Sequence, residues 1–318
     1  MELDWKKQAE ELSGKGFSGR QIAKIIGKSK SAINDHLKNL REGRRNDFNG
    51  DWYQHTNSVN KSNTERSGKP KMGRKHLIIA DTQVKPRADL TYLEALGNYI
   101  AEKKPDVIIH IGDHMDMESL SSYDKGKKSF EGRRVKADLD AGYAGMEALV
   151  SPFRGVSGYN PEMHFCCGNH EARIDRFSND NPEFEGFLGT ELLDLEKYGW
   201  VVHPFLKPVE IDGIFYVHYL SNPFNGRPYG GTAINQLKTI GKSFVVGHKQ
   251  CLDIGIRPTL DGKMQIGIIN GAFYPHDEDY KGYQGNNHFR GVTMLHNVKD
   301  GYGDPMMVSL EYLVNKYS

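Results

Sequence analysis

Cysteine and long hydrophobic runs are both scarce in this sequence. Only 3 of its 318 residues are cysteine, and two of these are adjacent, Cys166 and Cys167, so a disulfide framework is excluded. The longest apolar runs, such as residues 107–111, are far too short to span a bilayer, which excludes a membrane protein. The first ten residues lack the apolar stretch of a signal peptide. We therefore expect a soluble, cytoplasmic protein.

Net charge is also nearly absent, but the charges are unevenly distributed. The whole chain has 42 Lys and Arg against 41 Asp and Glu, a net charge of +1. Residues 1–75 contain 17 basic and 9 acidic residues, a net of +8, whereas residues 76–318 contain 25 and 32, a net of −7. A basic segment, residues 1–75, followed by a mildly acidic one indicates a polyanion as the partner of the basic segment.

Residues 4–42 have the pattern of three short helices, separated by breaks at 14–16 and 27–29. The stretch 16–40 has the form G-x-S-x-x-x-I-A-x-x-x-G-x-S-x-x-x-I-x-x-x-L, which resembles the helix-turn-helix of resolvases and invertases. The resemblance implies DNA binding by the start of the second helix of the motif. The residues it would place against DNA are Lys28, Ser29, Lys30, Ser31 and Asn34. A three-helix module that binds protein is the alternative.

The domain organisation follows from a change in composition. Residues 46–74 are polar, rich in Asn and Ser, and lack apolar periodicity, which predicts a flexible basic linker. It would join a helix-turn-helix DNA-binding domain at 1–45 to a second domain at 75–318, and would add to the contact with DNA.

The second domain begins with apolar runs of strand length that alternate with helical patterns. Three such runs, each ending in a polar cluster, cover residues 76–81, 106–113 and 163–170, and the helical patterns cover 90–103 and 135–150. After Trp200 the sequence is rich in strand patterns, with one helix predicted near 231–240. Alternating strands and helices predict an α/β domain whose site lies at the carboxyl ends of the strands.

Polar residues follow four of the predicted strands, in the clusters 80–83, 112–116, 168–171 and 247–250, and a fifth predicted strand, 214–220, contains His218. Taken singly, an Asp at a strand end is more often a turn cap. Together, Asp, Asn and His residues with neighbouring glycines are what a two-metal hydrolytic centre needs, because one carboxylate can bridge two cations about 3.5–4 Å apart.

These clusters resemble the calcineurin-like metallophosphoesterases, whose ordered pattern is D-x-H, GDxxD, GNH[D/E], a lone His and GHxH. The sequence matches GDxxD at 112–116 and GNHE at 168–171 in full. The resemblance covers about residues 75–270. It implies a layered β-sandwich flanked by helices, two divalent metal ions, and in-line attack on a phosphate ester by metal-bound hydroxide.

The resemblance also assigns residues to the site. The first metal would be held by Asp81 and Asp113, with Gln83 and Gln250 at the two remaining ligand positions; the second would be held by Asp113, Asn169, His218 and His248. His170 would act as the acid or stabilise the leaving group, and Asp116 would orient it.

Two positions depart from the family pattern, and both belong to the first metal. Gln83 and Gln250 stand where the family has histidines. Since an amide oxygen is a harder and weaker ligand than imidazole, the first site would be weak and would prefer Mn²⁺ or Mg²⁺. Alternatively the first site is empty and activity is weak or lost. We favour the active interpretation because both acids and His170 remain.

The remaining candidate residues have less specific patterns. His110 lies inside an apolar strand and is expected to be a core histidine, and Cys166 and Cys167 are expected to fill the core. Arg173 and Arg176 follow His170, and either phosphate contact or solvent exposure fits them.

The sequence thus predicts a metal-dependent nuclease tethered to DNA by a helix-turn-helix. One alternative is a DNA-binding regulator whose phosphoesterase domain only senses a ligand, and another is a phosphomonoesterase or nucleotide phosphatase. Short spacings after GNHE leave no large cap domain, which favours an open groove. The arrangement suits a phage or mobile-element protein acting in a host cytoplasm. The sequence leaves open the polarity of cleavage and whether the protein forms a homo-oligomer.

Overall fold

The computed structural model describes residues 5–38, 72–122, 125–278 and 282–318. The chain divides into two compact units, residues 1–71 and 72–318, here called the head and the body. Most of the predicted linker, residues 46–74, lies outside the described residues.

The head contains the helices that the sequence predicts. They are α1 (Trp5–Gly14), α2 (Gly19–Ile26) and a further helical segment at residues 30–38. Ala9, Ile22 and Ile33 are fully buried and form the centre of a small apolar core, one from each segment. Gly27 ends α2 in the left-handed conformation (φ 73°), which glycine adopts without steric cost. The breaks between the helices therefore fall at the predicted glycines.

The body contains two sheets. In its described part, the first sheet has the strand order β11-β10-β1-β2-β3-β4 and the second β5-β6-β7-β9-β8. Strands β1 to β4 are parallel, as are β6, β7 and β9, and the remaining pairs are antiparallel. The strands are β1 (Arg74–Ile79), β2 (Val107–His110), β3 (Glu162–Cys166), β4 (Val201–His203), β5 (Val209–Ile211), β6 (Ile214–Tyr216), β7 (Phe244–Val246), β8 (Leu252–Pro258), β9 (Met264–Asn270), β10 (Gly291–Lys299) and β11 (Tyr302–Ser309).

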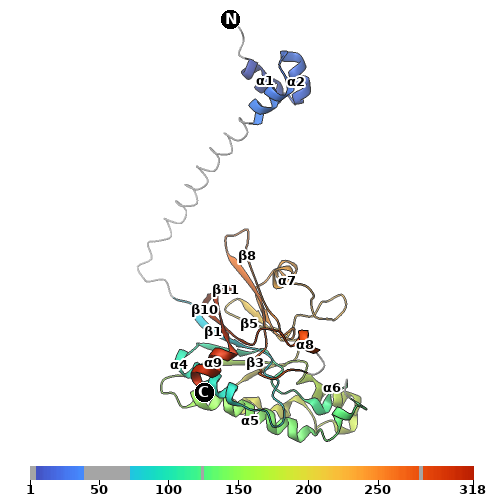
Figure 1. The fold of residues 1–318 in the computed structure, drawn as a ribbon, viewed down its shortest axis with the longest axis vertical. Coiled ribbons are helices and arrows are strands. Elements are labelled where there is room, and N and C mark those ends of the chain that lie inside the picture. The colour runs from blue at the N-terminus through green and yellow to red at the C-terminus, as the bar shows by residue number, and fades with distance from the viewer. Residues whose placement is uncertain (1–4, 39–71, 123–124, 279–281) are drawn as a thin grey trace. The chain divides into compact units, whose positions relative to one another are not determined.

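Helices cover the outer faces of the two sheets. The α-helices are α4 (Thr91–Lys103), α5 (Val135–Arg154), α6 (Ala172–Asp180), α7 (Ala233–Ile240), α8 (Gly282–Gly285) and α9 (Leu310–Tyr317). Short 3₁₀ helices are η1 (Glu118–Leu120), η2 (Lys128–Phe130), η3 (Pro182–Phe184), η4 (Thr190–Leu193) and η5 (Leu195–Tyr198). Figure 1 shows α4, α5 and α9 beside the first sheet and α7 beside the second.

The alternation of side chains along a strand produces four layers. Leu77 and Ile79 of β1 face the core under α4 and α5, whereas Ile78 faces the core between the two sheets. A third core lies between the second sheet and α7, around Phe244 and Leu237. The predicted α/β sandwich flanked by helices is therefore confirmed.

The structure differs from the prediction at two places. The predicted strand 214–220 ends at Tyr216, so His218 lies in the loop that follows β6. Strand β11 and helices α8 and α9 were not predicted. Asp304 and Pro305 give β11 an atypical strand sequence, and it is tolerated because β11 is an edge strand paired only with β10. Within the described ranges, no helix is both long enough and apolar enough to cross a membrane.

Candidate metal centre and active site

The predicted site residues lie on loops that follow five strands, from both sheets. Those of the first sheet follow β1 (Asp81 and Gln83), β2 (Asp113 and Asp116) and β3 (Asn169 and His170), and those of the second follow β6 (His218) and β7 (His248 and Gln250). Backbone hydrogen bonds join these loops: Gln83 N–H donates to the Asp113 carbonyl (2.9 Å), and Gly247 N–H donates to the His218 carbonyl (2.9 Å). The site therefore lies where the ends of the two sheets meet.

The residues predicted for the second metal converge. Asp113, His218 and His248 each offer a ligand atom within 4.8 Å of the others. The Oδ1 of Asn169 lies 2.9 Å from His218 Nε2 and 2.8 Å from His248 Nδ1. His218 Nδ1 lies 2.8 Å from the carbonyl of Ile111, to which it can donate. This bond fixes the ring and leaves Nε2 toward the cluster, an orientation typical of metal-binding histidines.

The residues predicted for the first metal also fit a cation. Asp81 is fully buried and Gln83 nearly so, and among the described residues Asp81 Oδ2 and Gln83 Oε1 have no hydrogen-bond partner. Buried oxygens without donors are costly unless a cation satisfies them. Gln250 differs, because its Oε1 already accepts a hydrogen bond from the hydroxyl of Tyr274 (2.9 Å). Its carbonyl oxygen is therefore shared with a protein donor.

The pKa values of the two buried carboxylates, Asp81 and Asp113, are shifted in opposite directions. Burial, with the charge of Asp113, raises the pKa of Asp81 to about 7. Burial also opposes ionisation of Asp113, but His170 and His218 outweigh it and hold its pKa well below the usual range. A divalent cation would stabilise both as carboxylates.

The backbone around the centre is strained. Among the seven predicted metal ligands, five have positive φ: Asp81 (43°), Gln83 (38°), Asp113 (52°), His248 (65°) and Gln250 (56°). Non-glycine residues rarely adopt this conformation, and such residues cluster at functional sites. These positive-φ residues turn the backbone so that the predicted ligands of successive loops face the same site.

Two glycines of the motifs are required by close packing. Gly112 has φ +90°, and a Cβ there would lie 2.5 Å from the carbonyl oxygen of Cys166. At Gly168 a Cβ would lie 2.1 Å from Oδ1 of Asp113. The carboxylate therefore packs directly on the Gly168 backbone, which explains glycine in both GD and GN.

Glu171, the last residue of GNHE, holds the loop after β2. It is fully buried, and its carboxylate accepts backbone hydrogen bonds from Asp113 (2.9 Å), His114 (2.7 Å), Met115 (3.1 Å) and Gly168 (2.7 Å). Sequence reasoning did not include Glu171 among the site residues. The acid at the fourth position of the motif was the available signal.

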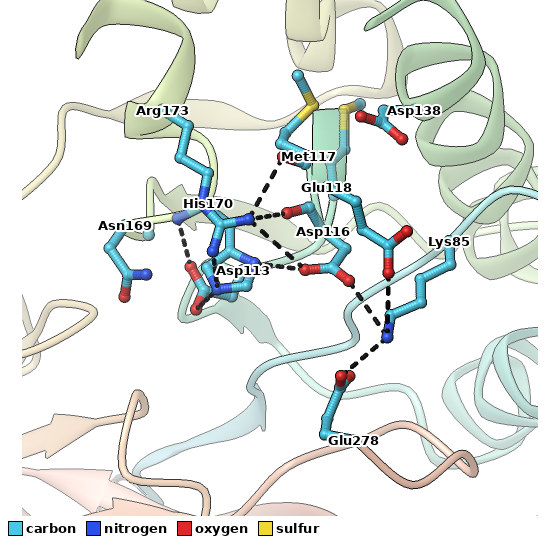
Figure 2. A network of polar contacts seen from close by, with 12 residues as sticks. Lys85, Asp113, Asp116, Met117, Glu118, Asp138, Asn169, His170, Arg173 and Glu278 are labelled. Carbon is cyan, nitrogen blue, oxygen red and sulfur yellow. Dashed lines mark hydrogen bonds and ion pairs between the residues drawn. The ribbon is translucent and has the colours of Figure 1, made fainter. Parts of the chain in front are cut away.

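His170 and Asp116 form a pair beside the metal residues (Figure 2). His170 Nδ1 lies 2.8 Å from Asp116 Oδ1, and its Nε2 lies 3.7 Å from Asp113 Oδ2. Burial disfavours the charged form of His170, but Asp113 and Asp116 outweigh burial and raise its pKa. Burial likewise opposes ionisation of Asp116, but the hydrogen bond and charge of His170, aided by Lys85, lower its pKa to about 2.

Arg173 and Lys85 support this pair. Arg173 Nη1 donates to the carbonyl of Asp116 (2.7 Å), and its Nη2 lies 3.1 Å from His170 Nε2 (Figure 2). Arg173 is therefore partly buried and tied to the GDxxD loop. Lys85 lies within 3.4 Å of carboxylate oxygens of Asp116, Glu118 and Glu278. No motif marks Lys85, so the sequence could not identify it.

Other predicted residues lie as follows. His110 is fully buried in β2, and Cys166 and Cys167 are buried in the core, as expected. The five residues expected to face DNA, Lys28, Ser29, Lys30, Ser31 and Asn34, are all exposed on the head.

Fold and site together define a metal-dependent phosphoesterase. Comparison with known families agrees: residues 75–288 match the family described as calcineurin-like phosphoesterase. The chain belongs to this family. The match begins after the head, so the helix-turn-helix has no support from it and stays a prediction.

Similar proteins include two phage proteins and a bacterial one. The Gene 54 proteins of Mycobacterium phages D29 and L5 are each 28% identical over 182 residues, which cover 56% of this chain and 69% of theirs. A solved structure of a conserved protein described as a predicted phosphoesterase, from Streptococcus pneumoniae TIGR4, aligns with a TM-score of 0.32 and 10% identity over 75% of this chain and 90% of that chain.

Proposed function

We propose that this protein is a nuclease, a metal-dependent phosphodiesterase that acts on DNA and is tethered to it by the head. The observation that carries the choice of DNA is the head itself: a three-helix unit with Lys28 and Lys30 exposed, within a segment of net charge +8. Each phosphate that such residues neutralise releases counterions and favours binding. The phage relatives support action in the cytoplasm of a host cell.

The body supplies the chemistry in this proposal. Two divalent cations, Mn²⁺ or Mg²⁺, would activate water and neutralise charge on the phosphodiester. They would be held by Asp81, Gln83, Asp113, Asn169, His218, His248 and Gln250. Asp113 would serve both cation positions, because it lies beside residues of both predicted ligand sets: Gln83 N–H donates to its carbonyl (2.9 Å), and His218 Nε2 lies 3.3 Å from its Oδ2. It also accepts a hydrogen bond from the backbone N–H of His170 (2.9 Å).

His170 is the proton donor to the leaving oxygen in this mechanism. Its Nδ1 is held by Asp116, so the proton would be transferred from Nε2, the nitrogen nearer to Asp113. Arg173 lies against that nitrogen and would have to release it when a substrate phosphate enters.

The tether gives the nuclease its substrate at high local concentration. A head bound to DNA turns the encounter of the body with a phosphodiester into an intramolecular event, at an effective concentration set by the segment between them. We therefore expect DNA to be cleaved far better than a small phosphodiester.

A DNA-binding regulator with weak or absent turnover is the second candidate. The observation that favours it is the engagement of Gln250 Oε1 by Tyr274, because a shared oxygen is a poorer metal ligand. In that case the body would bind a phosphorylated ligand without hydrolysing it. A phosphomonoesterase is the third candidate and is distinguished by its substrate.

The deciding experiment incubates the full chain with labelled linear, nicked and single-stranded DNA under Mn²⁺, Mg²⁺ or EDTA. p-Nitrophenyl phosphate and its diester are tested in parallel. We expect metal-dependent DNA cleavage that is abolished in Asp113→Ala and His248→Ala, with DNA binding by the head unchanged. DNA binding without cleavage under any metal would favour the regulator, and preference for the monoester would favour the phosphatase.

A further inference from the structure

A buried chain of hydrogen bonds lies directly behind the metal centre. Thr82, His110 and His114 are each fully buried. Thr82 Oγ1 lies 3.2 Å from His110 Nε2 and 2.8 Å from His114 Nδ1. At the two ends, His110 Nδ1 accepts from the backbone N–H of Gly112 (3.1 Å), and His114 Nε2 lies 2.9 Å from the carbonyl of Gly142 in α5.

With both imidazoles neutral, the two end groups determine the direction of every hydrogen bond in this series. A backbone N–H can only donate, so His110 Nδ1 must be an acceptor and His110 must carry its proton on Nε2. A carbonyl can only accept, so His114 must also carry its proton on Nε2. The Thr82 hydroxyl then accepts from His110 and donates to His114. All polar atoms of the three side chains are satisfied with both imidazoles neutral.

The hydrogen bonds of Thr82, His110 and His114 join the two loops that carry Asp81 and Asp113, the carboxylates of the proposed first metal site. Thr82 lies next to Asp81 (φ 43°) and His114 next to Asp113 (φ 52°), two residues with strained backbones. Other hydrogen bonds also hold these loops: Phe273 N–H donates to the carbonyl of Asp81 (3.1 Å), and Glu171 holds the loop after β2. His114 adds a link to α5, and His110 adds one to β2. Strained conformations persist only where surrounding structure holds them.

We infer that Thr82, His110 and His114 are positioning residues, which set the affinity of the protein for a divalent cation at Asp81 and Asp113. None of the three is among the predicted ligands or belongs to the catalytic pair. The inference rests on the metal centre of the proposed function and is independent of DNA as the substrate.

The test compares Mn²⁺ binding by calorimetry in the metal-free full chain and its variants. Thr82→Val keeps the shape of the side chain but removes the hydroxyl, and we expect Mn²⁺ affinity to fall about 10-fold to 100-fold, as for other groups that orient metal ligands. Thr82→Ser restores the hydroxyl and should restore the affinity. Wild-type affinity in Thr82→Val, or failure of Thr82→Ser to rescue it, would overturn the inference.

A matched control exists in β10. Thr293 is also fully buried, but its hydroxyl has no hydrogen-bond partner in the described part of the chain, so Thr293→Val should leave Mn²⁺ affinity unchanged. A loss equal to that of Thr82→Val would show that any buried Thr→Val change disturbs the centre and would overturn the inference.

A measurement on the wild type covers the case in which Thr82→Val does not fold. Imidazole ¹⁵N NMR of the metal-free protein at pH 7 should show His110 and His114 both protonated on Nε2 only. A proton on Nδ1 of either ring would contradict the chain of bonds. Failure of the wild type to bind Mn²⁺ would instead contradict the metal centre, and with it the positioning role, while the NMR result would still report on the hydrogen bonds.

Discussion

At the scale of single residues, the missing Cβ of Gly168 leaves the space that the Asp113 carboxylate occupies. The space that a Cβ would need is occupied by the carboxylate of Asp113, at 2.1 Å, and the backbone N–H of Gly168 is bonded to Glu171. The Gly168 backbone is therefore held in place by Glu171, and the Asp113 carboxylate packs directly against it. The glycine of GNHE is thus a packing requirement of its neighbour in GDxxD.

We predict that Gly168→Ala displaces the Asp113 carboxylate and lowers phosphodiesterase activity by about 100-fold, the cost typical of a misplacement near 1 Å. Hydrolysis of the small diester under Mn²⁺ measures this loss. Gly155→Ala is the matched control, because a Cβ at Gly155 meets nothing within 4 Å. Equal activity in the two variants would show that the close approach is relieved without consequence.

His76 provides a pH dependence of stability away from the metal centre. It is fully buried, its Nε2 lies 2.9 Å from Asp212, and burial lowers its pKa although Asp212 opposes the shift. Because the unfolded chain then binds protons more readily than the folded body, the free energy of unfolding falls as the pH drops below about 6.5.

We predict that replacing His76 removes part of this loss of stability at low pH. In His76→Gln, the decrease in unfolding free energy between pH 7 and pH 5 should be smaller than in the wild type, by at most about 1.4 kcal/mol per pH unit. Denaturant unfolding at both pH values measures it, and titrations in the metal centre cancel because both proteins share them. An equal decrease in both proteins would contradict the shift.

At the scale of elements, the loops after β1 and β7 carry the two glutamines of the proposed first metal site. They bring Gln83 and Gln250 to the positions of two family histidines, and the Gln83 oxygen is buried without a partner while that of Gln250 is shared with Tyr274. A cation bound there would thus have its two acids but only weak neutral ligands.

We predict that Gln83→His with Gln250→His lowers the Mn²⁺ concentration for half-maximal activity about tenfold, equivalent to ~1.4 kcal/mol of binding free energy. Each single change should do less. Activity and calorimetric titrations of the wild type and the variants measure this. If the wild type and the double variant bind two equivalents with the same affinity, the glutamines do not contact the metal.

At the scale of the whole molecule, the chain combines a basic three-helix head with a phosphoesterase body. The head residues expected to face DNA are exposed, and the charges of the two parts have opposite sign. We therefore expect the head to provide affinity and the body to provide cleavage.

Deleting residues 1–45 should weaken DNA binding about tenfold or more and flatten its dependence on salt, because fewer counterions are released. Cleavage of the small diester should be unchanged. Binding is measured by fluorescence anisotropy at several salt concentrations. Equal loss of activity on DNA and on the small diester would instead indicate that the head stabilises the body.

The sequence by itself determined the type of each predicted ligand and the order of the motifs, because these chemical groups follow strands that are readable from apolar runs. Local patterns also located the helices of the head and α4, α5 and α7. Edge strand β11 was missed, since Asp304 and Pro305 hide its strand character, and Lys85 was missed because its carboxylate partners come from distant segments.

The resemblance implied a sandwich of sheets, but only the tertiary structure decided that both sheets contribute side chains to the site. Asp81, Asp113 and Asn169 come from the first sheet, and His218 and His248 come from the second, so their meeting depends on how the sheets pack around the core between them. The tertiary structure also decided that Glu171 holds the loop after β2 and that Thr82 links the loops after β1 and β2. Such contacts join residues far apart in the chain, and periodicity reports only on neighbours.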